Sequence, residues 1–330
     1  MKIDFQVYLE FHINCHSFEK ENLKKIKVIL FMNKVVVTGS NGLLGQSLLN
    51  LLLQEKEKYQ IFGFSRGENR SGREDFKYIS IDITNEENLK ESIKEIQPNF
   101  IINTAAMTQV DDCENNKEAC DLLNIDVVKW LSEVSNEINA HLIHISTDFI
   151  FDGKKGNYKE TDTANPLSYY GLSKLKSEEV LAKSEINYTI LRTILVYGKV
   201  FDMSRSNIVL WVREMLSKGK EITIVDDQFR TPTYVEDLAL ACKISMDKKA
   251  TGIYNIASNE LLSVFEIAQQ IADAFQLDKG LIKPISTSIL NQTAPRPAKT
   301  GFDLSKINKE LNFYSKSFKE DLQRFKETLM

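Results

Sequence analysis

The sequence predicts an α/β fold, a doubly wound parallel sheet followed by a smaller C-terminal α+β lobe. Short apolar runs alternate with amphipathic stretches of ten or more residues from Lys34 to Leu191, as βαβ units require. The alternation becomes irregular after Gly198, and three of the six prolines lie between Pro284 and Pro297. The 330 residues also exceed what one hydrophobic core usually serves, so two lobes sharing a cleft are expected.

The alternation assigns the elements in chain order. In the first half, strands are expected over 35–37, 60–64, 78–81, 100–103, 141–146 and 188–191, and helices over 43–53, 88–96, 123–138 and 168–183. In the second half, apolar spacing predicts helices over 206–218, 234–245 and 263–275. We therefore expect residues 32–198 to form mainly the sheet domain and residues 199–330 mainly the smaller lobe, with some crossover of the chain between them.

Residues 1–31 differ from the rest of the chain. They mix charges and histidines with short apolar runs and lack the uninterrupted apolar core of a signal peptide or a membrane span. Met32 stands directly before the first expected strand. We expect residues 1–31 to be a loosely attached N-terminal extension, or Met32 to be the natural start.

Composition and charge exclude several classes of protein. The hydrophobic share of 42% and the charged share of 27% are typical of a globular protein in water. The net charge of -4 argues against nucleic acid or an anionic membrane as the main partner. No C-x-x-C pair occurs, so neither a disulfide framework nor a metal site is expected and a reducing cytoplasm fits best; the four cysteines are Cys15, Cys113, Cys120 and Cys242.

A glycine-rich loop follows the first expected strand and opens the first helix. Its spacing is G-x-x-G-x-x-G over 39–45. Glycines permit a tight turn and close approach of the backbone, and a helix N-terminus offers unpaired N–H groups to a pyrophosphate. With a strand before the loop and a helix after it, a dinucleotide site is favoured over a turn that is merely glycine-rich. The residues expected to bind the cofactor are Gly39, Ser40, Asn41, Gly42, Leu43 and Leu44.

The end of the second strand bears on the choice of cofactor. Segment 60–67 contains no Asp or Glu to bind the 2′-hydroxyl of NAD, whereas Ser65-Arg66 could meet a 2′-phosphate. NADPH is therefore expected, with NADH left open and a solvated surface role for Arg66 as the alternative. Polar or small residues at the ends of the next two strands complete the expected cofactor contacts: Asp82, Ile83, Ala105, Ala106 and Thr108.

A tyrosine and a lysine four residues apart, Tyr170 and Lys174, suit proton delivery to a carbonyl. On a helix this spacing puts both side chains on one face. Acting as an acid near neutrality requires the tyrosine pKa to fall by about 3 units, or roughly 4 kcal/mol, and a cation about 4 Å away supplies about that much. Thr147, at the end of the preceding strand, can donate to the substrate oxygen. His141 and His144 are expected to pack or face solvent rather than to bind a metal.

Together these motifs resemble the extended short-chain dehydrogenase/reductase superfamily and, within it, the dTDP-4-dehydrorhamnose reductases. The resemblance covers about residues 33–312. The narrower match rests on segments 105–111, 146–153, 165–171, 191–198, 227–233 and 296–297.

The resemblance implies transfer of a hydride from NAD(P)H to the C4 ketone of a nucleotide-linked sugar, dTDP-4-dehydro-L-rhamnose. It implies that Tyr170 protonates the alkoxide, that Lys174 lowers the tyrosine pKa and holds the nicotinamide ribose, and that Thr147 orients the carbonyl. Asp148 is expected in the same pocket. The matching motifs also place Leu195, Arg230 and Arg296 at the substrate; Leu195 stands where the family often carries Trp, and Thr300 where Ser is common.

Other interpretations stay open at this point. One is a non-catalytic NADP-binding regulatory subunit similar to the β subunit of methionine adenosyltransferase, and another is a sugar-nucleotide epimerase. The intact Thr147, Tyr170 and Lys174 favour the enzyme. A homodimer is left open.

Overall fold

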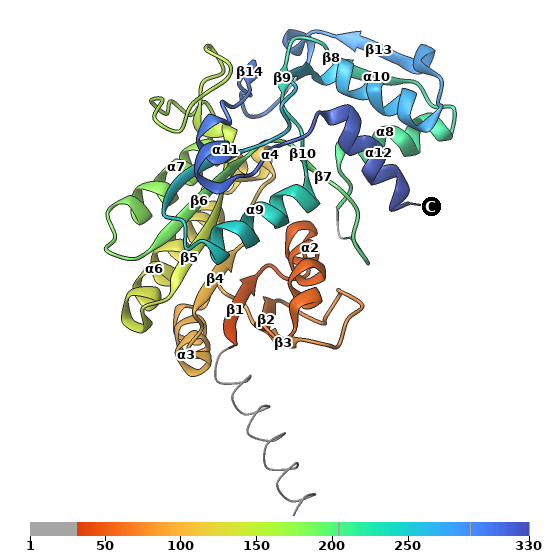
Figure 1. The fold of residues 1–330 in the computed structure, drawn as a ribbon. Coiled ribbons are helices and arrows are strands. Elements are labelled where there is room, and N and C mark those ends of the chain that lie inside the picture. Colours follow the sequence, from red (N-terminus) through yellow and green to blue (C-terminus); the bar gives the residue numbers. More distant parts are fainter. Residues whose placement is uncertain (1–31, 204, 291, 330) are drawn as a thin grey trace, which may run out of the picture.

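The computed structural model describes residues 32–203, 205–290 and 292–329 (Figure 1). The expectations for residues 1–31 and for Cys15 lie outside these ranges. A seven-stranded parallel sheet forms the centre of the fold, in the spatial order β11-β6-β5-β4-β1-β2-β3. Its strands are β1 (Asn33–Thr38), β2 (Tyr59–Ser65), β3 (Lys77–Ser80), β4 (Phe100–Asn103), β5 (His141–Thr147), β6 (Tyr188–Thr193) and β11 (Gly252–Ile256). The predicted doubly wound sheet is confirmed.

Helices cover both faces of this sheet. Alternate residues of β1 point to opposite faces, so Val35 and Val37 pack into one hydrophobic cluster and Val36 into another. The first cluster lies under α2 (Leu43–Leu52) and α9 (Val235–Asp247), which contact each other. On the other face lie α3 (Glu86–Ile96), α6 (Val127–Ile138) and α7 (Tyr169–Ala182).

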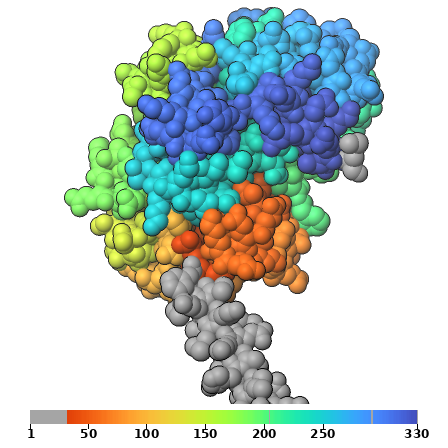
Figure 2. Space-filling view, viewed as in Figure 1, coloured from red at the N-terminus to blue at the C-terminus, as the bar shows by residue number. Residues whose placement is uncertain are grey.

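The sheet domain differs from the prediction in three features. Strand β11 was not predicted, and the helix predicted over 234–245, α9, covers the sheet although it comes from the second half of the chain. Figure 2 shows α9, coloured cyan, between the orange N-terminal part and the blue C-terminal residues. Short helices α4 (Val110–Asn115) and α5 (Lys117–Asp121) precede a π-helical turn over Leu122–Asp126.

The smaller lobe packs around its own hydrophobic cluster, which includes Val212, Ile271 and Phe325. Its helices are α8 (Ile208–Ser217), α10 (Val264–Phe275) and α12 (Phe318–Glu327), and α11 (Ser305–Leu311) packs on β11. Its strands form short sheets: β7 (Val196–Tyr197) with β10 (Thr233–Tyr234), β8 (Ile222–Val225) with β13 (Ile282–Ile285), and β9 (Phe229–Arg230) between β12 (Leu262–Ser263) and β14 (Lys299–Thr300). The division of the chain near residue 198 stays a prediction.

Across the described ranges, no helix is both long enough and apolar enough to cross a membrane.

Candidate active site

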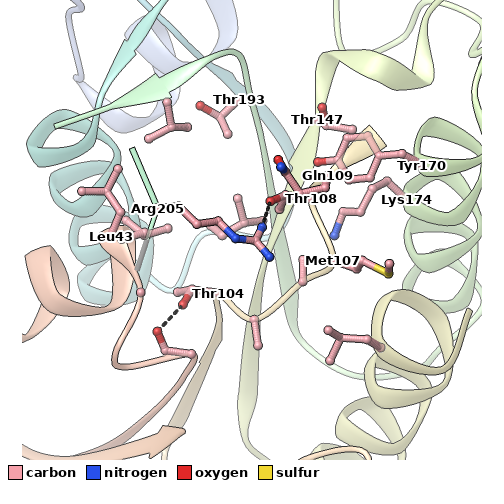
Figure 3. A pocket seen from close by; sticks show the side chains of 18 of the residues that line it. Leu43, Thr104, Met107, Thr108, Gln109, Thr147, Tyr170, Lys174, Thr193 and Arg205 are labelled. Carbon is pink, nitrogen blue, oxygen red and sulfur yellow. Dashed lines mark hydrogen bonds between the residues drawn. The ribbon is translucent and has the colours of Figure 1, made fainter. Parts of the chain in front are cut away.

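A cleft of about 1160 Å³ lies at the carboxyl ends of the sheet strands, where the smaller lobe meets them (Figure 3). In doubly wound sheets this edge is the usual place for ligands. The cleft brings together all but one of the residues that the sequence predicted for a site. They are Gly39, Asn41, Gly42, Leu43, Leu44, Ser65, Arg66, Asp82, Ile83, Ala105, Ala106, Thr108, Thr147, Asp148, Tyr170, Lys174, Leu195, Arg230 and Arg296.

The glycine loop forms a close backbone cradle at one end of the cleft. Gly39 has φ +68°, and a Cβ there would lie only 2.9 Å from Thr104 Oγ1 and 3.0 Å from the Ala105 nitrogen. Gly42 begins α2 without a side-chain cap, and no acidic residue occupies its first turn. Its first N–H groups therefore remain available to an anion. These features fit the pyrophosphate of a dinucleotide.

Ser40 is the residue that the structure does not bring to the cleft. Its side chain is fully buried, its nitrogen donates to the Phe64 carbonyl at 3.1 Å, and its Oγ has no hydrogen-bond partner in the described part of the chain. The tight turn directs the Ser40 side chain into the protein toward Gly63 of β2, so Ser40 does not line the cleft. Its contact with the cofactor stays a prediction.

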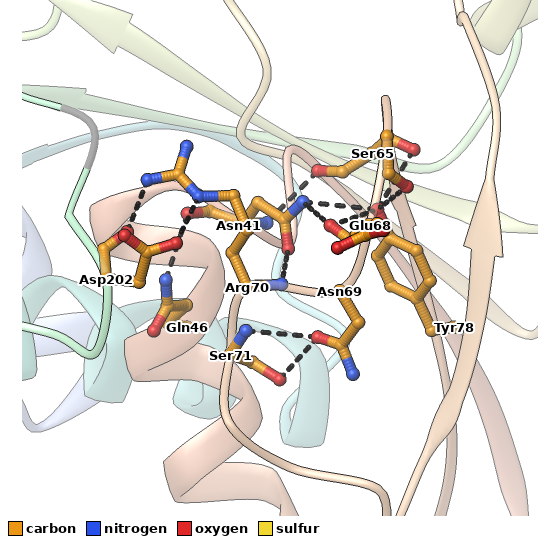
Figure 4. A network of polar contacts seen from close by, with 10 residues as sticks. Asn41, Gln46, Ser65, Glu68, Asn69, Arg70, Ser71, Tyr78 and Asp202 are labelled. Atoms are coloured by element: carbon orange, nitrogen blue, oxygen red, sulfur yellow. Dashed lines mark hydrogen bonds and ion pairs between the residues drawn. The ribbon is translucent and has the colours of Figure 1, made fainter.

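Asn41 connects the glycine loop to the end of β2 and the turn after it through hydrogen bonds (Figure 4). Its nitrogen donates to Ser65 Oγ at 3.0 Å, and its side-chain amide donates to the Glu68 carbonyl at 2.9 Å and to Tyr78 Oη at 3.1 Å. The Arg70 nitrogen donates back to Asn41 Oδ1 at 2.9 Å. The predicted loop residue thus braces the cradle through its side chain.

Arg66 is exposed at the edge of the cleft, where a ligand can reach it. Its side chain is 78% exposed, and its Nη1 lies 4.0 Å from Asp82 Oδ2. The other Asp82 oxygen accepts from the backbone and hydroxyl of Thr84, and these hydrogen bonds lower the pKa of Asp82. By contrast, Arg70 forms an ion pair with Asp202, with 2.7 Å between Arg70 Nε and Asp202 Oδ2. Arg66 is therefore the better candidate for a 2′-phosphate.

Tyr170 stands in the first turn of α7, whose N-cap Ser168 accepts from the Gly171 nitrogen at 3.3 Å. Figure 3 shows Tyr170 and Lys174 together beside Thr147. The expected fall in the tyrosine pKa is not found. Burial raises the pKa of Tyr170 above its ordinary value, and a hydrogen bond with Thr147 opposes that rise without cancelling it. The predicted net fall of this pKa is therefore wrong, whereas the effect of Lys174 on it stays a prediction.

Lys174 bonds to a residue that the sequence analysis had assigned to packing or the surface. Its Nζ lies 2.9 Å from His144 Nε2. His144 Nδ1 lies 3.1 Å from the Asn103 amide, and Asn103 Oδ1 accepts from Thr38 Oγ1 at 2.6 Å. The chain Thr38–Asn103–His144–Lys174 crosses from β1 to α7 inside the protein. The signal that could have found it was a titratable residue in the middle of an apolar strand.

Asn124 is a second residue that sequence reasoning missed. It sits in the π-helical turn, where irregular helix often marks a functional site. Its side chain accepts from the Met107 nitrogen at 2.8 Å and donates to the Met107 carbonyl and to Ser173 Oγ, each at 3.0 Å. It therefore fixes the cleft-lining segment after β4 against the helix that carries Tyr170. A polar residue within an apolar run was the available signal.

Asp148 and Arg230 form a buried polar group on the side of the smaller lobe. Arg230 Nε lies 3.9 Å from Asp148 Oδ2, and Thr300 donates to the same oxygen. Burial raises the pKa of Asp148 and lowers that of Arg230. Thr300 thus supplies a hydroxyl to Asp148 at the position where the family commonly has serine.

Arg296 and Leu195 complete the predicted substrate side. Arg296 makes a bidentate pair with Asp111 at 3.0 and 2.8 Å, which joins the late loop to α4. Leu195 has φ +43°, an unusual conformation for a bulky residue that often marks a functional site. Both line the cleft.

The fold and the cleft define the class: a Rossmann-type α/β protein of the short-chain dehydrogenase/reductase kind. Residues 32–330 match the family model described as the RmlD substrate binding domain. The chain belongs to this family. Among the described residues, no group of three or more His, Cys, Asp or Glu side chains is arranged to hold a metal.

The relatives of this chain include reductases and regulatory subunits. The chain is 31% identical over 308 residues to a dTDP-4-dehydrorhamnose reductase of Aggregatibacter actinomycetemcomitans, covering 89% of this chain and 99% of the relative. It is 30% identical over 279 residues to methionine adenosyltransferase 2 subunit beta of Bos taurus, and the match covers 83% of this chain and 81% of the relative. A dTDP-4-dehydrorhamnose reductase from Bacillus anthracis, solved in complex with NADP, superposes with TM-score 0.79 at 28% identity, covering 90% of this chain and 99% of that one.

Proposed function

We propose that this protein is an NADPH-dependent reductase of a nucleotide-linked 4-keto sugar, with dTDP-4-dehydro-L-rhamnose as the first candidate. The observation that carries the proposal is the convergence of Thr147, Tyr170 and Lys174 in the cleft that the glycine loop opens into. The reductase relatives, one of them solved with NADP, support the choice of substrate and cofactor.

Residues of this chain can supply the proton that the sugar oxygen takes up when its ketone is reduced. A bound reduced nicotinamide would supply the hydride. Tyr170 keeps its proton at neutral pH because burial raises its pKa, and it can still donate to an alkoxide, which is a much stronger base than a phenolate. The Thr147 hydroxyl, which donates to Asp148 Oδ1 at 3.1 Å, would turn to donate to the same oxygen as negative charge develops. Lys174, as an ammonium, would hold the ribose hydroxyls beside them.

Replacing Arg66 with alanine is expected to lower the preference for NADPH over NADH by about tenfold, since a hydrogen bond to a charged group contributes about that much. The measurement is the ratio of the two dissociation constants from fluorescence titrations. Arg73→Ala is the matched control, because Arg73 pairs with Asp75 and lies outside the cleft. An unchanged ratio in Arg66→Ala would remove Arg66 from the cofactor site.

The experiment that tests the proposed function is NADPH consumption with a panel of dTDP- and GDP-linked 4-keto sugars. Turnover of at least one, with the dTDP-linked rhamnose precursor preferred, is expected. Leu195 in place of an aromatic ring leaves less apolar area for the sugar, so a raised KM for that substrate would be consistent with the proposal. No turnover of any 4-keto sugar would contradict it.

A second candidate function is that of a non-catalytic NADP-binding subunit, favoured by the likeness to methionine adenosyltransferase 2 subunit beta. It is tested by mixing the protein with a purified methionine adenosyltransferase catalytic subunit and measuring complex formation by size-exclusion chromatography. A stable complex, together with tight NADPH binding and no sugar turnover, would favour this function over the reductase.

A further inference from the structure

One arginine of the cleft differs from the others in its partners. Three of the four arginines that line the cleft have a carboxylate oxygen within 4.0 Å. These ion pairs are Arg66–Asp82, Arg230–Asp148 and Arg296–Asp111. The fourth, Arg205, makes no ion pair with a described residue, and its one hydrogen bond to them runs from Nη1 to Thr108 Oγ1 at 3.5 Å, the outer limit for such a bond. The described residues therefore do not neutralise the charge of Arg205.

Arg205 reaches into the cleft from the segment that leads into α8. Figure 3 shows its side chain directed across the cleft, between Leu43 at the start of α2 and Thr108 on the segment after β4. Leu43 belongs to the glycine loop, and Thr108 is one of the residues predicted to contact the cofactor. The unneutralised guanidinium thus lies between two parts of the expected nucleotide site.

Hydrogen bonds fix the chain on both sides of Arg205. On one side, Arg70 donates from Nε to Asp202 Oδ2 at 2.7 Å and from Nη2 to the Asp202 carbonyl at 2.5 Å, which ties residue 202 to the loop between β2 and β3. On the other side, Asn207 is the N-cap of α8 and accepts from the Leu210 nitrogen at 3.2 Å. These contacts hold the base of the Arg205 side chain at the cleft without engaging its guanidinium.

One anionic part of the proposed reactants has no cation assigned to it. In the proposed function, Arg66 meets the 2′-phosphate and Lys174 holds the nicotinamide ribose, whereas the glycine loop and the uncapped start of α2 offer only N–H groups to a diphosphate. A diphosphate is anionic at neutral pH, and the planar guanidinium can donate to two phosphate oxygens at once. Its chemistry therefore matches the charge that Arg205 presents.

We infer that Arg205 is a binding residue for the diphosphate of a nucleotide in the cleft: its guanidinium leaves Thr108 and donates to phosphate oxygens. The inference rests on the proposed function, because NADPH and the nucleotide-linked sugar each contain such a diphosphate. The two sources share one chemistry, and measurements of binding distinguish them.

The test is the affinity of Arg205→Gln for NADPH and for dTDP, each measured by isothermal titration calorimetry. Losing a charged hydrogen-bond donor is expected to weaken the ligand whose diphosphate Arg205 binds by about ten- to hundredfold. Adenosine 2′-monophosphate and thymidine, which lack the diphosphate, should bind as they do to the parent in NMR titrations. Arg205→Lys keeps the charge but not the planar fork, so it should lose less affinity than Arg205→Gln. Arg205 is exposed, so neither replacement disturbs the core.

Arg213→Gln is the matched control. Arg213 lies on α8 in the same lobe, with its guanidinium 5.1 Å from the centre of the Phe275 ring, and it does not line the cleft. Its replacement removes the same charge from the same lobe. All four ligands should therefore bind to this variant as they do to the parent.

The outcomes identify the source of the diphosphate. With parental affinity for the two diphosphate-free ligands, a loss for NADPH assigns Arg205 to the cofactor, a loss for dTDP assigns it to the substrate, and a loss for both assigns it to both. Parental affinity for both diphosphates, or an equal loss for the ligands that lack one, would overturn the inference.

The readout is binding, so a failure of the proposed function is seen separately, as a parent protein that binds NADPH but reduces no 4-keto sugar. The affinities of Arg205→Gln would then still decide the role of Arg205. A parent that binds neither NADPH nor dTDP would overturn both.

Discussion

Tyr170→Phe is expected to lower kcat by about a hundredfold or more, which corresponds to losing a positioned acid. The phenol lies beside Thr147 in the cleft, and the phenylalanine ring would preserve the packing against Phe149, whose ring centroid is 5.7 Å away. Affinity for NADPH should therefore stay near that of the parent. The measurement is steady-state reduction of the preferred 4-keto sugar, beside a fluorescence titration with NADPH.

Tyr169→Phe is the matched control for this variant. Tyr169 precedes Tyr170 on α7, but its hydroxyl donates to Asp121 at 2.7 Å and it does not line the cleft. Its removal should leave kcat essentially unchanged. If Tyr170→Phe were as active as the parent, the proton would have to come from another residue.

Arg192→Ala is expected to reduce the free energy of unfolding by about 3–5 kcal/mol, the cost of leaving a buried charge without its partner. Arg192 and Glu178 are each 5% exposed, and the guanidinium meets the carboxylate through Nε at 3.0 Å and Nη2 at 2.6 Å. Ser146 also donates to Glu178. The pair ties α7, which carries Tyr170, to strands β5 and β6.

Chemical denaturation of Arg192→Ala and of Lys183→Ala gives the comparison. Lys183 pairs with Glu179 at the end of the same helix, but these side chains are 80% and 54% exposed. Lys183→Ala should therefore lower the free energy of unfolding by less than about 0.5 kcal/mol. Equal losses in the two variants would show that the buried pair does not anchor the helix.

Local sequence patterns were enough to predict the strands of the central sheet as far as β6. The strand 35–37, the glycine loop and the helix from Leu43 follow one another closely, so composition and spacing predict them directly. Strand β11 was missed because it follows the irregular second half and pairs with β6, far back in the chain. Pairing between strands that lie far apart in the sequence does not change the local pattern of apolar residues, so that pattern cannot predict it.

The site divides in the same way. Residues at strand ends and in the glycine loop were predictable because parallel strands bring their carboxyl ends to one edge. The contacts between His144 and Lys174 and between Arg296 and Asp111 were not, since each depends on how separate elements pack. The pKa of Tyr170 was predicted in the wrong direction because spacing shows a nearby cation but not the depth of burial.

The central claim is hydride transfer to a sugar ketone with proton delivery from this cleft. Its most direct test uses NADPH deuterated at the transferable position of the nicotinamide C4 and the preferred 4-keto sugar nucleotide, with the product analysed by NMR. The account predicts a 4-hydroxy sugar with deuterium at C4, and no such product on the same timescale from Tyr170→Phe. A product without deuterium at C4, or no product from the parent, would contradict it.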